Sequence, residues 1–340
     1  MKIKYKPKTL IITCLLFLLI LLGFYCVLNS SARSVYLNRV RVAEDLEENY
    51  YLEAIDENKG YQMPRHWLVY TPRSGLLSRL KIASPVGLAD TVLKLEYDIE
   101  WSEKPLPESI CTFIELQSLS LSNMKLTARE ALIIGKLKNI TSISFFDCNL
   151  STEFCSNFPI KNRISDIYLY DTKVGTSNLS NLLNRIPGLT DLSIGKYNLT
   201  SEVIKNIQSL RLESLSLRHC SVDKEILQQI IKIKTLEYID LSYNTLASRT
   251  FEMLATLPKL RHLDIRGTTF SPTELSDLSA SKSLAEIWIS SREMKSSDLD
   301  PLFKIRTLKH ITAVLPTKEP HPKTHKDIKV DIIRYDYETE

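Results

Sequence analysis

A spacing of about 24 residues recurs along most of this chain of 340 residues and limits the folds that the chain can adopt. The repeated unit has aliphatic residues at positions 1, 4 and 6, a small or polar residue at position 9 and an apolar residue at position 11. A repeat this regular indicates a solenoid of stacked coils rather than two ordinary globular domains. The first positions of the successive units are Leu116, Ile140, Ile164, Leu189, Leu212, Leu236, Leu260, Leu284 and Leu308.

Each unit predicts a short strand followed by a helical segment. Side chains at positions 4 and 6 lie on one face of a strand and those at 5 and 7 on the other, so the aliphatic face is buried. Several units then open a helix, as in the capping boxes Thr127–Glu130 and Ser271–Glu274, the second with Pro272 at its first helical position. One coil cannot bury its own apolar face, whereas stacked coils share a core. We therefore expect an α/β solenoid of about nine coils.

The pattern resembles the leucine-rich repeat family, whose consensus is L-x-x-L-x-L-x-x-N/C-x-L. The resemblance covers residues 92–315, because Val92 starts one further unit at the same spacing. It implies a horseshoe with a parallel β-sheet on its concave face. In that family an Asn at position 9 usually bonds the backbone of the neighbouring coil and so forms a ladder. Here only Asn244 is an Asn at that position, while Tyr197 and Arg292 are too large, so we expect the ladder to be broken.

An uncharged segment precedes the repeats. No charged residue lies between Lys8 and Arg33, and residues 9–28 are almost entirely apolar. A helix of about 20 such residues spans about 30 Å, the thickness of a bilayer core. The basic tail, residues 1–8, favours the cytoplasmic side of the membrane. We expect one transmembrane helix that leaves the repeats on the periplasmic or extracellular side.

A cleaved secretory signal peptide is the alternative for this segment. Ser30, Ser31 and Ala32 provide small residues for cleavage after Ala32, which would make the protein secreted. The apolar run is longer than the roughly 7–15 residues usual in signal peptides, which favours an uncleaved anchor.

Two further segments flank the repeats. Residues 29–91 are expected to form a juxtamembrane helix and an N-terminal cap over the first coil. The order of short motifs from Ala54 to Leu95 resembles the lead-in of membrane-anchored bacterial leucine-rich repeat proteins of the planctomycete type. Residues 316–340 form a C-terminal tail or cap, in which the alternation from Ile328 to Tyr337 predicts a strand that closes the solenoid.

The sequence carries no catalytic signature: it has no G-x-S-x-G, no Walker loop, no H-E-x-x-H and no C-x-x-C. His321 and His325 are four residues apart, but prolines break the segment around them, so we predict a solvated loop there. The formal charge is +4, and the four lysines of the basic tail account for all of it. Because these signatures are missing, we expect no enzymatic activity, no cofactor and no metal site. Because the rest of the chain has no net charge, we expect no nucleic-acid partner.

The concave face is the surface on which the sequence predicts function. Its outward positions, 3, 5, 7 and 8, are mostly serine in the first coils but aromatic and charged from the third coil onward. Tyr, Trp and Arg are enriched at binding hot spots. Asp240 and Asp264 occupy position 5 of successive coils, with Arg218 and Arg266 as their expected counter-ions. The predicted partner-binding residues are Tyr168, Tyr170, Arg218, His219, Tyr238, Asp240, Tyr243, His262, Asp264, Arg266 and Trp288.

These patterns predict a membrane-anchored, non-catalytic recognition scaffold that binds a protein or glycan on its concave face. An alternative is an intracellular substrate-recognition adaptor resembling the leucine-rich repeat part of ubiquitin ligases. Such adaptors normally carry an F-box module before the repeats, and residues 33–91 are short for one. The concave charges also allow a different interpretation, a solvated surface that only neutralises itself.

Overall fold

The computed structural model describes residues 68–70, 92–98, 105–106, 108–112, 116–291, 294–322 and 325–335. It divides the chain into two compact units, one of residues 1–96 and 107–116 and the other of residues 97–106 and 117–340. β1 (Leu68–Tyr70) of the first unit pairs antiparallel with β2 (Val92–Asp98), whose last two residues belong to the second unit, and a 3-10 helix, η2, covers Glu108–Thr112 of the first unit.

Several predicted segments lie outside the described residues: the basic tail, the membrane segment 9–28, the cleavage site after Ala32 and most of the cap. Within the part of the chain that the structure does describe, no helix is long and apolar enough to cross a membrane.

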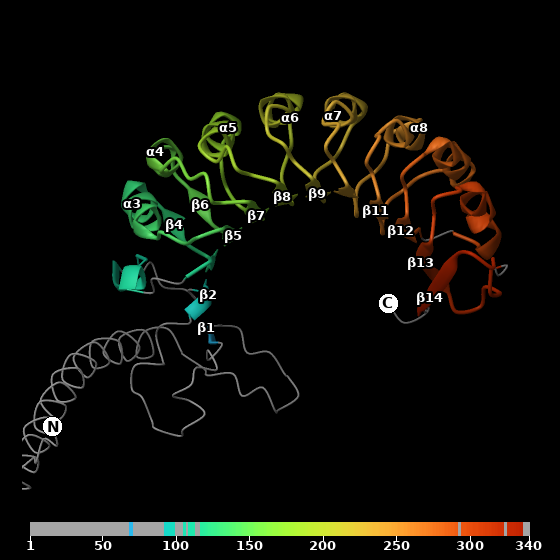
Figure 1. Ribbon diagram of the computed structural model, residues 1–340, viewed down its shortest axis with the longest axis horizontal. Helices are drawn as coiled ribbons and strands as arrows, with labels where there is room; N and C mark the ends of the chain where they lie inside the picture. Colours follow the sequence, from blue (N-terminus) through green and yellow to red (C-terminus); the bar gives the residue numbers. More distant parts are fainter. Residues whose placement is uncertain are drawn as a thin grey trace, which may run out of the picture. The chain divides into compact units, whose positions relative to one another are not determined.

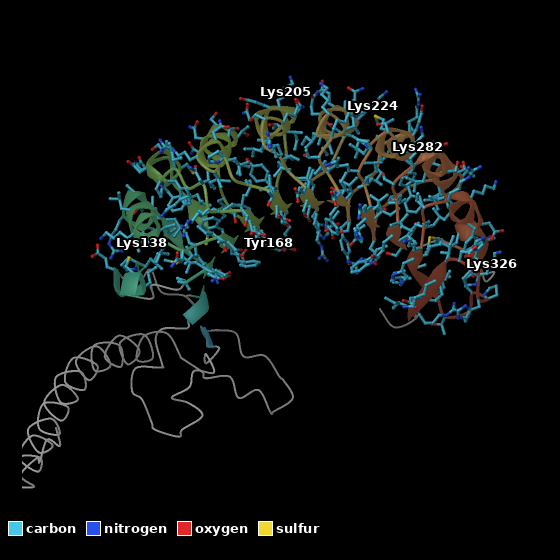
Figure 2. The ribbon with its side chains drawn as sticks, viewed as in Figure 1. Lys138, Tyr168, Lys205, Lys224, Lys282 and Lys326 are labelled. Atoms are coloured by element: carbon cyan, nitrogen blue, oxygen red, sulfur yellow. The ribbon has the colours of Figure 1, made fainter. Side chains whose placement is uncertain are left out.

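The second unit is a solenoid in which each coil contributes a strand to the inner side and a helical segment to the outer side (Figure 1). Lys205 and Lys224 lie on the outer side and Tyr168 on the inner side (Figure 2). The strands pair in parallel in chain order. They are β3 (Ser118–Ser122), β5 (Ser142–Phe146), β7 (Asp166–Tyr170), β8 (Asp191–Gly195), β9 (Ser214–Arg218), β10 (Tyr238–Asp240), β11 (His262–Ile265), β12 (Glu286–Ser290), β13 (His310–Pro316) and β14 (Lys329–Tyr335).

The outer layer consists of short helices, one to a coil. The α-helices are α3 (Ala128–Lys136), α4 (Thr152–Asn157), α5 (Thr176–Asn184), α6 (Ser201–Ile207), α7 (Lys224–Ile230) and α8 (Thr250–Ala255). They are followed by the 3-10 helices η3 (Pro272–Ala280) and η4 (Ser296–Lys304). Two short strands, β4 (Lys125–Leu126) and β6 (Asn149–Leu150), form a second parallel pair. The predicted parallel α/β solenoid is therefore confirmed.

The repeat register predicted from the sequence is confirmed as well. Equal positions of successive coils face each other, as in the pairing of Ile239 with Leu263. The side chains at positions 4 and 6 are buried, and Leu241 is 0% exposed. A shift of one residue would turn this aliphatic face toward solvent, so the burial of the two positions holds the strands in register.

The ladder at position 9 is interrupted, as expected, but small side chains carry it across part of the solenoid. In the second, third and fifth coils a smaller side chain donates to the position-6 carbonyl of the preceding coil, whereas Thr268 of the seventh coil donates to Ile265 O of its own coil at 2.6 Å. The bonds between coils run from Cys148 Sγ to Leu121 O at 3.3 Å, from Thr172 Oγ1 to Phe145 O at 3.0 Å and from Cys220 Sγ to Ile194 O at 3.2 Å. Tyr197 does interrupt the series, because its hydroxyl donates to Val174 O instead, at 3.1 Å. Arg292 lies outside the described residues.

The two predicted capping boxes have different outcomes. The first is present at the start of α3, where the Thr127 N–H donates to Glu130 Oε2 at 2.9 Å. The second is absent, because η3 is a 3-10 helix and the Ser271 hydroxyl lies 2.9 Å from the Thr273 hydroxyl rather than capping a backbone N–H. The predicted closing strand is present as β14, which pairs in parallel with β13.

Candidate partner-binding site

Most of the predicted binding residues gather on or directly after four adjacent strands, β9 to β12 (Figure 1). We call this surface the β9–β12 face, and it comprises Arg218, His219, Tyr238, Asp240, Tyr243, His262, Asp264, Arg266 and Trp288. Tyr168 and Tyr170 lie apart on β7, with β8 between them and β9. They make their own contacts, Tyr168 with the ring of Phe146 and Tyr170 with the ammonium group of Lys196.

Asp240 and Asp264 are paired across β10 and β11, as predicted, but both are buried, at 8% and 2% exposed. Asp264 forms an ion pair with Arg266, which donates from Nε to Oδ1 at 3.0 Å and from Nη2 to Oδ2 at 2.6 Å. These hydrogen bonds hold the pKa of the Arg266 guanidinium above its ordinary value. Asp240 instead accepts from the Ser216 hydroxyl at 2.9 Å and from the Ser242 N–H at 2.8 Å.

Arg218 does not act as the counter-ion that the sequence predicts. Its guanidinium lies over the ring of Tyr243, 4.5 Å from the centroid, and its Nε is buried without a hydrogen-bond partner in the described structure. The His219 ring stacks on the same tyrosine, with centroids 4.6 Å apart. Burial, together with the charges of Arg218 and Lys196, holds the pKa of His219 below its ordinary value. Arg218, His219 and Tyr243 therefore form a stack of side chains with one permanent cation, which we call the Tyr243 stack.

Two members of this stack have unusual backbone geometry. His219 and Tyr243 occupy position 8 with φ of 54° and 58°, a left-handed backbone that position 8 has in every coil from Asn123 to Gly267, including Lys196 with φ of 51°. For a bulky residue the left-handed region costs about 1–2 kcal/mol. Gly267 makes room for the tyrosine, because a Cβ there would lie 2.7 Å from the Tyr243 ring.

Trp288 is the exposed aromatic residue at the C-terminal side of the face, at 37% exposed. The Arg266 guanidinium lies over its ring, 4.4 Å from the centroid. Its indole Nε1–H donates to Glu286 Oε1 at 2.6 Å. Arg266 thus joins Asp264 to Trp288, and both arginine contacts fix the position of its guanidinium.

Glu286 belongs to the site but was missed by the sequence reasoning. It lies 3.0 Å from His262 Nδ1 and 3.3 Å from His310 Nδ1. Burial raises the pKa of this carboxyl, but the hydrogen bond from Trp288 and the two histidines outweigh burial, so the pKa lies below its ordinary value. The signal was present in the sequence, because His262, Glu286 and His310 follow one another at intervals of 24 residues, all at position 3.

His310 extends this network to the last strand. Its Nε2 lies 2.7 Å from Asp331 Oδ2, and Lys329 Nζ lies 2.6 Å from the same oxygen. Hydrogen bonds from Lys329 and His310 hold the pKa of Asp331 below its ordinary value.

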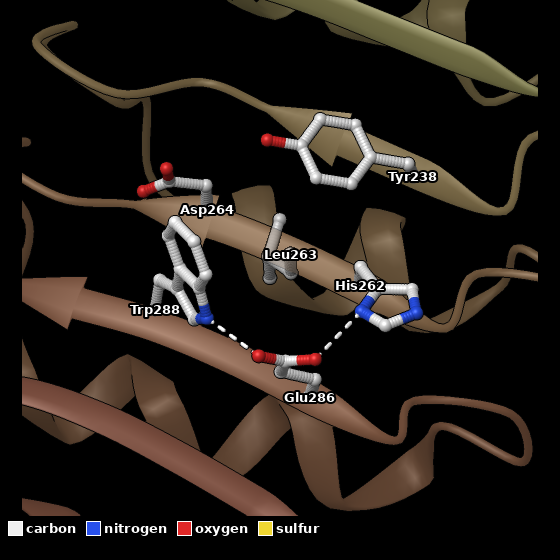
Figure 3. A pocket seen from close by; sticks show the side chains of 6 residues that line it. All are labelled: Tyr238, His262, Leu263, Asp264, Glu286 and Trp288. Carbon is white, nitrogen blue, oxygen red and sulfur yellow. Dashed lines mark hydrogen bonds and ion pairs between the residues drawn. The ribbon is translucent and has the colours of Figure 1, made fainter. Parts of the chain in front are cut away.

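Two hollows open on this part of the molecule. The smaller, of about 50 Å³, has Tyr238 and Trp288 among its walls (Figure 3). We call it the Tyr238–Trp288 cleft, and its lining is Tyr238, His262, Leu263, Asp264, Glu286 and Trp288. Burial, with the nearby carboxylates Asp240 and Asp264, raises the pKa of Tyr238 to about 12. The larger hollow, of about 300 Å³, borders the Tyr243 stack and is lined by His219, Ser221, Val222, Asp223, Tyr243, Asn244 and Thr245.

Known proteins offer a likeness in structure only. No family model matches the chain, and no curated protein matches it. Internalin C2 from Listeria monocytogenes is 18% identical, with a TM-score of 0.40 over 61% of this chain and 84% of that protein. Internalin F from the same bacterium is 14% identical, with a TM-score of 0.37 over 72% of this chain and 82% of its own. TLR13, solved in complex with ssRNA13, is 16% identical, with a TM-score of 0.42 over 60% of this chain and 30% of TLR13.

Proposed function

We propose that this protein is a non-catalytic recognition scaffold of the leucine-rich repeat type, which binds a protein or glycan partner through the β9–β12 face. The observation that carries the proposal is the placement of aromatic and charged side chains from four successive coils on one face. Tyr243 and Trp288 are the exposed aromatic members, at 44% and 37% exposed. Exposed aromatic residues beside arginines are the composition of binding hot spots.

The internal contacts of the face also support this proposal. Arg266 is held by Asp264 on one side and Trp288 on the other, and Arg218 is held against Tyr243. Side chains that are already fixed lose little conformational freedom when a partner binds, so more of the contact energy contributes to affinity. A face that only neutralised its own charges would not need the exposed rings of Tyr243 and Trp288.

We further propose that residues 9–28 anchor the protein in a membrane, in the manner of the bacterial membrane-anchored proteins that its lead-in resembles, and that the repeats are exported. The length and apolar character of the segment support this, as does the basic tail before it.

We expect protease added to intact cells or sealed spheroplasts to digest the repeats, while a carbonate wash leaves the protein in the membrane fraction. Periplasmic marker proteins of known orientation serve as controls for sealing. Repeats that are digested only after lysis would support the intracellular adaptor instead. Release of a shortened chain into the medium would support cleavage after Ala32.

Trp288→Ala should weaken binding of a partner by more than about 1 kcal/mol, because the indole is an exposed ring at the centre of contacts with Arg266 and Glu286. The thermal stability of the variant should change little, since the ring is partly exposed. A partner is first captured from cell extracts or from glycan and RNA arrays with the full chain, and its affinity for wild type and variant is then measured by titration.

Lys205→Ala, on the outer helix α6, is the matched control and should leave affinity unchanged. Equal affinity of the wild type and Trp288→Ala would place the binding site elsewhere. Capture of RNA alone would replace the protein or glycan partner with a nucleic acid.

A further inference from the structure

We infer that the Tyr238–Trp288 cleft accepts one positively charged side chain, a Lys or Arg, presented by a protein partner. This inference rests on the proposed function, because it names the chemical group that the partner brings to the β9–β12 face. It also chooses between the two classes of partner, since it requires a protein rather than a glycan.

The size of the cleft supports a side chain as its occupant. Its volume is about 50 Å³, whereas sites for small molecules and cofactors usually measure about 300–1,000 Å³. Such a recess has room for one compact head group and is too small to enclose a sugar ring or a nucleotide. A protein partner can fill it with a single residue while the rest of the contact lies on the surrounding sheet.

The charges around the cleft favour a cation. Asp264 and Glu286 line the cleft, and Asp240 lies beside Asp264 at the equivalent position of the neighbouring strand β10. Arg266 balances Asp264, while His310 is shared between Glu286 and Asp331. Among the four carboxylates Asp240, Asp264, Glu286 and Asp331 there are two permanent cations, Arg266 and Lys329, so the group has more carboxylates than permanent cations. An incoming carboxylate or phosphate would meet this excess negative charge, whereas an ammonium or guanidinium group would balance it.

The walls of the cleft fit the same occupant. Figure 3 shows Tyr238 on one side of Leu263 and Trp288 with Glu286 on the other. Aromatic rings attract cations over their faces, and Trp288 already has the Arg266 guanidinium over its ring. Within the described residues the Tyr238 hydroxyl makes no hydrogen bond, so its oxygen is free to accept one from an ammonium or guanidinium N–H.

The test uses the full-length chain in detergent micelles, with 5-fluorotryptophan in place of its 3 tryptophans. The ¹⁹F resonance of Trp288 is identified by its loss in Trp288→Phe. The probes are Nα-acetyl-arginine methylamide, its neutral isostere built on citrulline, and Nα-acetyl-glutamate methylamide. We expect the arginine probe to shift the Trp288 resonance saturably, with the citrulline probe at least about tenfold weaker and the glutamate probe without effect.

Glu286→Gln removes one cleft charge while keeping an oxygen that can accept from the indole. It should weaken the arginine probe at least about fivefold. Glu237→Gln is the matched control, because Glu237 pairs with Arg261 and does not line the cleft, and it should leave the titration unchanged.

An equal response to arginine and citrulline, or no response to any probe, would overturn the inference. A response to arginine without any effect of Trp288→Ala on partner affinity would contradict the proposed function but leave the cation site in place. The reverse result, a loss of partner affinity without a response to arginine, would remove the cation site and keep the proposed function.

Discussion

Replacing Asn244 with Ala should lower the free energy of unfolding by about 4 kcal/mol, because this side chain satisfies buried backbone groups of two coils. Its Nδ2 donates to Leu217 O at 2.7 Å and to Leu241 O at 2.8 Å. Its Oδ1 accepts from the Cys220 N–H at 2.9 Å and from the Val222 N–H at 3.3 Å. Alanine would leave these groups without a partner in a region that water does not reach, and each such group costs about 1–3 kcal/mol.

Chemical denaturation of the two chains side by side measures this difference. Asn198→Ala is a suitable control, because Asn198 occupies the exposed position 10 of the fourth coil and should change stability by less than about 0.5 kcal/mol. A loss below about 1 kcal/mol in Asn244→Ala would mean that the neighbouring thiols and hydroxyls can hold the coils together without the amide.

The strand register was predictable because burial depends on position alone. Any aliphatic residue at position 6, such as Leu241, fills the core in the same way, so the spacing of such residues identifies the strands. The interruption of the ladder at Tyr197 was predictable from the size of that side chain, but the bonds that small side chains form between coils were not. The physical requirement is only a short polar group that reaches a carbonyl, and Cys148, Thr172 and Cys220 meet it.

The composition of the β9–β12 face followed from the register, but its pairings did not. Arg218 and Arg266 occupy the same position two coils apart, yet one stacks on Tyr243 and the other binds Asp264. The difference depends on neighbouring groups, because the Asp240 carboxylate already accepts hydrogen bonds from the Ser216 hydroxyl and the Ser242 N–H and forms none with Arg218 in the described structure. A choice among rotamers of this kind is decided by three-dimensional packing, which the spacing of residues along the chain does not contain.

Arg266→Ala should lower the free energy of unfolding by about 3–5 kcal/mol, a cost typical of leaving a buried charge without its partner. The Asp264 side chain is 3% exposed, and the arginine side chain makes three charge-assisted contacts with it, from Nε to both carboxylate oxygens and from Nη2 to Oδ2. Without the guanidinium, Asp264 would also face the carboxylate of Asp240 with no cation between them. Arg266→Ala would therefore report fold stability more than binding, whereas Trp288→Ala reports binding.

A second substitution separates these effects. Asp264→Asn combined with Arg266→Ala removes the unpaired charge, so the double variant should recover most of the lost stability relative to Arg266→Ala alone. Urea denaturation of the wild type, both single variants and the double variant gives the coupling energy between the two side chains. Additive losses would show that Arg266 stabilises the solenoid through its stacking on Trp288 rather than through Asp264. A coupling energy of about 2 kcal/mol or more would show that the ion pair fixes the arginine from which the binding face is built.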